Sequence, residues 1–257
     1  MNQLITYMKP LQRTTVTQYI EKRISEFHDK REELLQGLDL REMLKHKNPY
    51  LFKAKNILTA QDLIKGFLDG YLQTQEGGVF GDVMQDIATF VCGQVFCGER
   101  IDKDINPELK NFDLGFQNGK KYYLVEIKSG WNWANSTQIR GMKDKTLSAS
   151  ENLKIHKDCE VVIVNGCCFG KRKSSTMPGG YLKICGQEFW EFISGDARLY
   201  IDIIEPIGHQ AKERSISYQK LYAQVVNKFT LAFSLEFCDD GIINWERLTR
   251  FISEKYT

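Results

Sequence analysis

Apolar residues recur at helical spacing over the first part of the chain. Between Thr15 and Leu35 they stand three or four positions apart, with polar residues between them, and Gly37 marks the end of this pattern. The spacing predicts a long helix there and a short one over Leu40–Lys45. The Asn48-Pro49 pair then interrupts the helical pattern, because the residue before a proline is disfavoured in the helical region.

Two further helices are expected before residue 99. Thr59 opens a T-x-x-D start signal with Asp62, and the helix that follows is predicted to end before Gly77-Gly78. The second of these helices begins at Phe80. The segment 99–110 is polar and predicts a loop with at most one short strand.

Near residue 111 the helical spacing of apolar residues gives way to alternation between apolar and polar residues, the pattern of a β-strand. Two strand-like runs, Asn111–Gln117 and Tyr122–Lys128, flank Asn118-Gly119, a strong hairpin signal. Short apolar runs predict two more strands, over Val161–Asn165 and Tyr181–Cys185. Helices are expected over 135–154, 187–193, 197–204, 217–233 and from 245 to the end.

The expected fold is α/β, with a mixed central sheet that contains an antiparallel hairpin and is flanked by helices. The length of 257 residues suits one domain enlarged at both ends. We predict a helical N-terminal part over 1–75, a core over 79–185 and a helical C-terminal part over 186–257.

Composition excludes several classes of protein. The chain is 42% hydrophobic with a net charge of +2, which excludes a disordered chain. No apolar run approaches the roughly 18 residues of a membrane span, and the first residues lack the apolar run of a cleavable leader, so we expect none. Seven cysteines without a CxxC pair match neither a disulfide framework nor a zinc finger. The expectation is a cytoplasmic protein without a membrane partner.

The small net charge hides one segregated stretch. Residues 161–183 contain Lys171, Arg172, Lys173 and Lys183 and no acidic residue. Such a stretch can face a polyanion. It can equally be a solvated loop, and the charge pattern alone leaves both readings open.

Charges inside the second hairpin strand point to a metal site. Glu126 and Lys128 are two residues apart, so they project from one face of an otherwise apolar strand. A turn at Asn118-Gly119 makes opposed residue numbers sum to 237, which sets Asp113 opposite Leu124 and diagonal to Glu126. Two carboxylates so placed can hold Mg²⁺, with Lys128 beside them to assist hydrolysis of a phosphodiester.

The same residues allow a purely structural interpretation. Glu126 and Lys128 can form a solvated ion pair on an edge hairpin, with Asp113 nearby. The E-x-K pattern is also common, since Glu108-Leu109-Lys110 repeats it in a polar segment. Spacing and burial pattern leave the two interpretations balanced.

The motif resembles that of the PD-(D/E)XK nuclease superfamily. Asn111-Phe112-Asp113 is followed after twelve residues by Glu126-Ile127-Lys128, and the continuation SGWNWANSTQ over 129–138 resembles a group of type II restriction endonucleases. Other similar stretches are the segments 48–52 and 186–190, the Phe80-Gly81 helix entry and the late Asp240-Gly241 with Trp245.

This resemblance implies specific roles. Asp113 and Glu126 would hold Mg²⁺, with the Ile127 carbonyl as a further ligand, and Lys128 would serve the hydrolytic water. Such enzymes are usually homodimers that cut both strands of a short DNA site. Two positions depart from the family pattern: Phe112 replaces the proline, and Gln85 stands where many members place a glutamate.

Residues beyond the hairpin are candidates for contacts with double-stranded DNA. Side chains of Asn and Gln can reach base edges or phosphates, and basic side chains suit phosphates. The candidates are Asn132, Asn135, Gln138, Arg140, Lys143, Lys171, Arg172 and Lys173.

The sequence therefore predicts a Mg²⁺-dependent, site-specific endonuclease of double-stranded DNA, a type II restriction enzyme. One alternative is a repair or structure-selective nuclease that uses the same site. Another is a non-catalytic DNA-binding protein with a nuclease-like fold. The intact Asp113, Glu126 and Lys128 set argues against the loss of catalysis.

Overall fold

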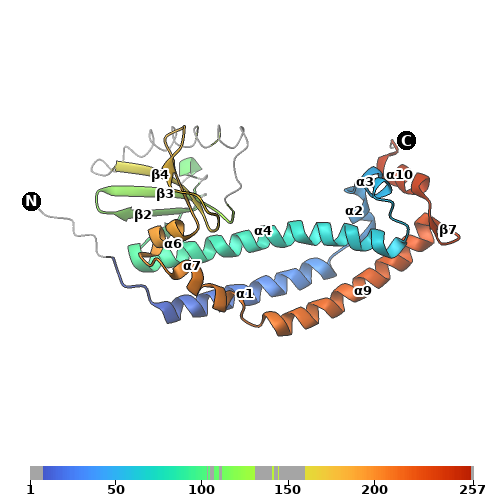
Figure 1. Cartoon of the computed structure of the whole chain (residues 1–257), viewed down its shortest axis with the longest axis horizontal. Coiled ribbons are helices and arrows are strands. Elements are labelled where there is room, and N and C mark those ends of the chain that lie inside the picture. The colour runs from blue at the N-terminus through green and yellow to red at the C-terminus, as the bar shows by residue number, and fades with distance from the viewer. Residues whose placement is uncertain are drawn as a thin grey trace, which may run out of the picture. The chain divides into compact units, whose positions relative to one another are not determined.

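A computed structural model describes residues 8–102, 104, 107–109, 112–130, 141, 144 and 160–255 (Figure 1). Contacts divide the chain into two compact units, Met1–Ile24 with Phe80–His209 and Ser25–Val79 with Gln210–Thr257. The helices are α1 (Arg13–Gln36), α2 (Leu40–Lys45), α3 (Pro49–Ala54), α4 (Ala60–Phe96), α6 (Gln187–Ser194), α7 (Leu199–Asp202), α8 (Ile204–Ile207), α9 (Ala211–Phe237) and α10 (Trp245–Ser253). The predicted division into parts 1–75, 79–185 and 186–257 stays a prediction.

The first unit contains a mixed sheet. Its strands are β1 (Glu99–Arg100), β2 (Leu114–Asn118), β3 (Lys121–Lys128), β4 (Glu160–Cys167), β5 (Ser175–Thr176) and β6 (Leu182–Cys185). In the described part of the chain they lie in the order β1-β2-β3-β4-β6-β5. The central pairs β3–β4 and β4–β6 are parallel, and the outer pairs are antiparallel. The expected mixed sheet with helices around it is confirmed.

Aromatic side chains cover one face of this sheet. Phe116 of β2 stacks on Tyr123 of β3, and both rings contact Phe192 of α6. Phe116 also contacts Phe96 near the end of α4. Since side chains alternate along a strand, Glu126 and Lys128 project from the opposite face.

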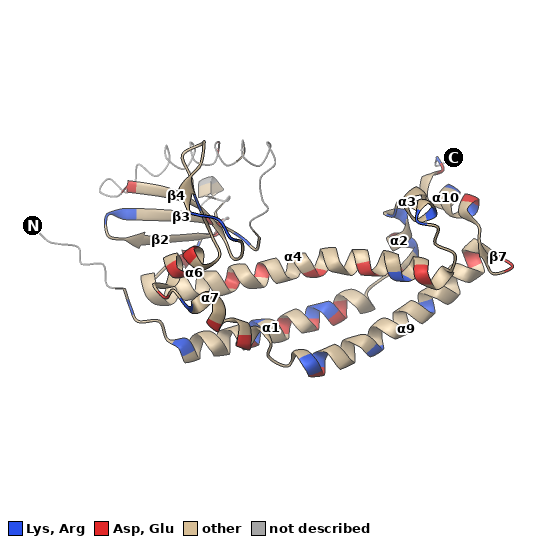
Figure 2. Cartoon of the chain, in the orientation of Figure 1, with Lys and Arg blue, Asp and Glu red and all other residues tan. Residues whose placement is uncertain are grey.

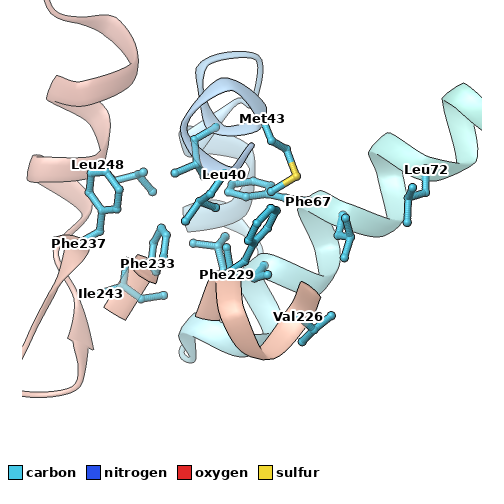
Figure 3. Close-up of a cluster of buried hydrophobic side chains, with 14 of the residues drawn as sticks. Leu40, Met43, Phe67, Leu72, Val226, Phe229, Phe233, Phe237, Ile243 and Leu248 are labelled. Atoms are coloured by element: carbon cyan, nitrogen blue, oxygen red, sulfur yellow. The ribbon is translucent and has the colours of Figure 1, made fainter. Parts of the chain in front are cut away.

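The second unit is built around a helical core (Figure 3). Leu40 and Met43 of α2, Phe67 of α4 and Phe233 of α9 are buried in it, as is Leu248 of α10. A small hairpin of β7 (Cys238–Asp239) and β8 (Ile242–Ile243) joins α9 to α10. The apolar spacing that predicts these helices therefore reflects one shared core.

Side-chain caps begin several of these helices. Thr59 accepts the N–H of Asp62 (3.1 Å) at the start of α4, which confirms the predicted signal. Asn48 accepts the N–H of Leu51 (3.2 Å) and begins α3 with Pro49 in its first turn. The Asn48-Pro49 pair thus starts a helix that the sequence analysis missed.

The helix α4 corrects one prediction. It runs without a break from Ala60 to Phe96, so the expected end before Gly77-Gly78 is wrong. Glycine lowers helix stability by about 1 kcal/mol relative to alanine, and burial of the helix on both sides of the pair outweighs this cost. None of the helices in the described ranges is long and apolar enough to cross a membrane.

Candidate active site

The hairpin between β2 and β3 has a different register from the predicted one. Its turn is Gly119-Lys120, with Asn118 opposite Lys121, so opposed numbers sum to 239 instead of 237. Of the two turn residues only Gly119 has a positive φ (63°), and glycine at the first central position with a positive φ defines a type II′ turn. The prediction that Asn118-Gly119 forms the turn is therefore wrong.

The corrected register brings Asp113 closer to the charged part of β3. Leu114 pairs with Val125, and one further step places Asp113 opposite Glu126 instead of diagonal to it. The Asp113 N–H donates to the Val125 carbonyl (2.9 Å), and the Asp113 carboxylate accepts the N–H of Ile127 (2.8 Å). Both hydrogen bonds hold Asp113 against the strand that carries Glu126.

Glu126 and Lys128 lie together at the carboxyl end of β3. The Lys128 ammonium is 2.9 Å from Oε1 of Glu126. Glu126 is 4% exposed, whereas the Lys128 side chain is about one-third exposed. The arrangement is therefore a buried carboxylate next to a partly accessible ammonium, which differs from the solvated pair of the structural interpretation.

The donor set fits a hard divalent cation. Mg²⁺ prefers oxygen ligands, and it is typically bound by one or two carboxylates while several waters remain on it. Asp113 and Glu126 supply such carboxylates, and the Ile127 carbonyl is a further oxygen on the same strand. Among the described residues no three His, Cys, Asp or Glu side chains gather into a group that could hold a metal ion.

The helix α4 passes beside this end of β3. A Cβ on Gly81 would lie 3.8 Å from the hydroxyl of Ser129, the residue after Lys128. Asp86 on the same helix forms ion pairs with Arg23 and Arg100. These pairs assign Asp86 a structural role in the first unit.

A basic loop follows β4 at the same end of the sheet. The N–H groups of Cys168 and Phe169 donate to the carbonyls of Lys128 (2.8 Å) and Ser129 (3.2 Å). Lys171, Arg172 and Lys173 are exposed on this loop and line a hollow of about 680 Å³ with the start of α6. Three of the predicted DNA-contacting residues therefore lie next to the end of β3.

The remaining predicted DNA contacts cannot be placed in the same way. Asn132, Asn135, Gln138, Arg140 and Lys143 lie outside the described residues. Figure 2 shows that acidic positions predominate over basic ones along α4. Among the described residues of the first unit, Lys171, Arg172 and Lys173 form an exposed basic loop beside this site.

Two polar residues near Glu126 were missed by the sequence analysis. Asn165 of β4 is in register with Glu126, and Lys183 of β6 is in register with Asn165. Both are buried. A charge inside an apolar strand is the signal that singles out Glu126. The same signal is present at Lys183, where the charge pattern indicates only a basic stretch.

The first unit has a mixed sheet, and its hairpin brings two carboxylates and a lysine to the end of one strand. This is the restriction-endonuclease-like fold. The family model of the type II restriction endonuclease EcoO109I matches residues 14–215 of the chain. The chain therefore belongs to the type II restriction endonuclease EcoO109I family, whose members are site-specific deoxyribonucleases. No curated protein matches it.

Proposed function

We propose that this restriction enzyme cleaves double-stranded DNA with Mg²⁺, and that Asp113, Glu126 and Lys128 form its catalytic site. The observation that most strongly supports this proposal is the hydrogen bond from the Ile127 N–H to the Asp113 carboxylate, which holds Asp113 beside Glu126. Asp113, Glu126 and the Ile127 carbonyl would hold the metal. When bound, Mg²⁺ would offset the negative charge that develops on the phosphate.

Lys128 is suited to interact with the water that attacks the phosphorus atom. Hydrolysis forms a bond between the water oxygen and phosphorus, breaks the bond from phosphorus to one ester oxygen, and passes a proton to that leaving oxygen. The partly exposed Lys128 ammonium can leave Glu126 to stabilise the attacking oxygen or the charge on the phosphate. Glu126 itself is buried on β3.

The loop of Lys171, Arg172 and Lys173 would contact backbone phosphates. Its three cations are exposed, and its backbone is bonded to the residues at the end of β3. Phosphate contacts position DNA without reading its sequence. Asn132, Asn135, Gln138, Arg140 and Lys143 stay predicted contacts to bases or phosphates.

The enzyme would act as a homodimer in the cytoplasm. Two-fold symmetry suits cleavage of both strands at a short site, because each protomer then faces one strand. Leu231 and Leu235 of α9 are 63% and 78% exposed and lie one helical turn apart. This apolar pair supports contact with a second copy, which analytical ultracentrifugation would detect as a dimer.

The variant Asp113→Asn tests the metal site. An asparagine keeps an oxygen that can accept the Ile127 N–H but loses the negative charge. We expect Mg²⁺-dependent cleavage of long duplex DNA to fall about a hundredfold or more, with the fold intact. Lys121→Met is the matched control, because Lys121 pairs with Glu160 at the far, exposed end of β3. Parental cleavage by Asp113→Asn would contradict the proposal.

A further inference from the structure

A row of three buried polar residues crosses the sheet at the active site. Glu126 of β3 is in register with Asn165 of β4, which is in register with Lys183 of β6. Residues in register on parallel strands point to the same face. Their exposures are 4%, 0% and 2%. The catalytic carboxylate therefore shares a buried face with a lysine that the proposed reaction does not use.

A buried lysine requires compensation. Lysine is almost never fully buried unless it is paired, because removing an ammonium from water is costly. The pKa of Cys167, two residues after Asn165, is raised to about 12, chiefly by burial and by Cys185; to a lesser extent Lys183 lowers it and Glu126 raises it. Both charges thus act on the same buried thiol, which places them in one electrostatic environment.

Lys128 cannot serve as the permanent partner of Glu126. Its ammonium contacts Oε1 of Glu126, but the side chain is partly exposed and its proposed role lies with the water and the phosphate. Glu126 remains buried when Lys128 turns away. A second, fixed cation on the same face would then balance the carboxylate.

Asn165 lies between the two charges and suits both. Its amide can donate through Nδ2 to a carboxylate and accept through Oδ1 from a cation. Within the described part of the chain, Nδ2 of Asn165 is buried without a hydrogen-bond partner, while Oδ1 accepts from the Cys167 thiol (3.6 Å). The amide donor is thus available on the face that carries Glu126.

We propose that Lys183 is a positioning residue of the active site, a fixed buried cation that balances Glu126 across Asn165 and sets the charge of the metal site. This inference rests on the function proposed above. Asp113, Glu126 and Lys128 together carry a charge of −1, and Lys183 brings the total to zero. Removal of Lys183 leaves the site more negative, so it should hold a divalent cation more tightly.

A double-mutant cycle tests the pairing without any cleavage assay. Lys183→Met and Glu126→Gln are made singly and together, and thermal unfolding is followed by circular dichroism. We expect Lys183→Met to lower the unfolding midpoint by several degrees in the parent and far less in the Glu126→Gln background. A single variant that fails to fold while the double variant folds also supports the pairing. Equal losses in both backgrounds, or a double variant that fails to fold, would overturn it.

Magnesium affinity provides a second readout. The backbones of Glu126 and Lys183 are two strand spacings apart, roughly 10 Å. At that range the lost repulsion should lower the Kd of Mg²⁺ about tenfold, measured by calorimetry without DNA. Lys121→Met should leave this Kd unchanged. An unchanged or higher Kd for Lys183→Met would contradict the proposal.

The two proposals fail in different ways. If Glu126→Gln binds Mg²⁺ and cleaves DNA like the parent, the proposed catalytic site is wrong. If Glu126→Gln loses Mg²⁺ binding but the cycle shows no coupling, the catalytic site stands and only the role of Lys183 is wrong.

Discussion

Gly166 determines how closely α6 packs on the central strand. A Cβ at this position of β4 would overlap the ring of Phe189. The adjacent Trp190 donates its Nε1–H to the Cys168 carbonyl (2.8 Å), which fixes α6 to the loop after β4. The glycine therefore keeps α6, β4 and the basic loop in a fixed relation inside the first unit.

The variant Gly166→Ala should destabilise the protein. The added methyl group must displace the buried Phe189 ring, and overpacking of this kind typically costs roughly 1–3 kcal/mol. Chemical denaturation followed by circular dichroism measures this loss. Gly70→Ala is the matched control, because a Cβ there meets nothing within 4 Å. A Gly166→Ala variant as stable as the parent would contradict the close packing.

At the residue scale the sequence singles out the charges proposed for catalysis more readily than their buried polar neighbours. Glu126 and Lys128 stand out because charges interrupt an apolar strand. Asn165 and Lys183 come next to Glu126 only through the pairing of β3, β4 and β6. Such pairing joins residues far apart in the sequence, so local periodicity does not disclose it.

The element that most departs from its local signals is α4. Gly77-Gly78 is a stop signal by propensity, yet the helix continues through it. Apolar positions on both sides, among them Leu72 and Val83, are buried and stabilise the helix there. Tertiary packing thus outweighs the preference of two residues.

Replacement of both glycines by alanine should stabilise the protein. A Cβ at Gly77 or Gly78 meets nothing within 4 Å, so the change adds helix propensity without a clash. We expect a gain of about 0.5–1 kcal/mol for each position in the free energy of unfolding. Urea titration of Gly77→Ala/Gly78→Ala against the parent measures it. A loss of stability would show that the helix needs flexibility at this pair.

The hairpin shows a second limit of prediction from sequence, this time in the position of a turn. The Asn-Gly signal correctly predicts a hairpin but places the turn one residue too early. The Asn-Gly pair is compatible with a two-residue turn that has glycine in the first or in the second central position. Type I′ and type II′ turns differ in which of these residues take positive φ. Both the predicted and the observed register place Asp113 on the same face as Glu126. The observed register brings Asp113 closer to Glu126 than expected.

At the scale of the whole molecule, the small net charge results from basic and acidic residues that lie in different places. A net charge of +2 does not indicate a DNA-binding protein, but it conceals an exposed basic loop beside the end of β3. Acidic residues are used in ion pairs such as those of Asp86. A near-neutral chain can therefore still present a local surface for a polyanion.

Replacing Lys171, Arg172 and Lys173 with alanine should weaken DNA binding at every sequence. Each lost phosphate contact removes about 0.9 from the slope of log K against log salt, so the slope should fall by about 2 to 3. Fluorescence anisotropy with duplex DNA over a salt series measures it. Replacing the exposed Lys212, Lys220 and Lys228 of α9 removes the same charge as a control. An unchanged slope for the loop variant would exclude it from the DNA interface.

The variant Glu126→Gln tests the proposal that Asp113, Glu126 and Lys128 form the catalytic site. The measurement is the single-turnover rate of cleavage of long duplex DNA in Mg²⁺, with Lys121→Met as the control. We expect discrete fragments from the parent and the control, and cleavage by Glu126→Gln at least about a thousandfold slower although circular dichroism shows that the variant is folded. The same fragments at the parental rate from Glu126→Gln would contradict it.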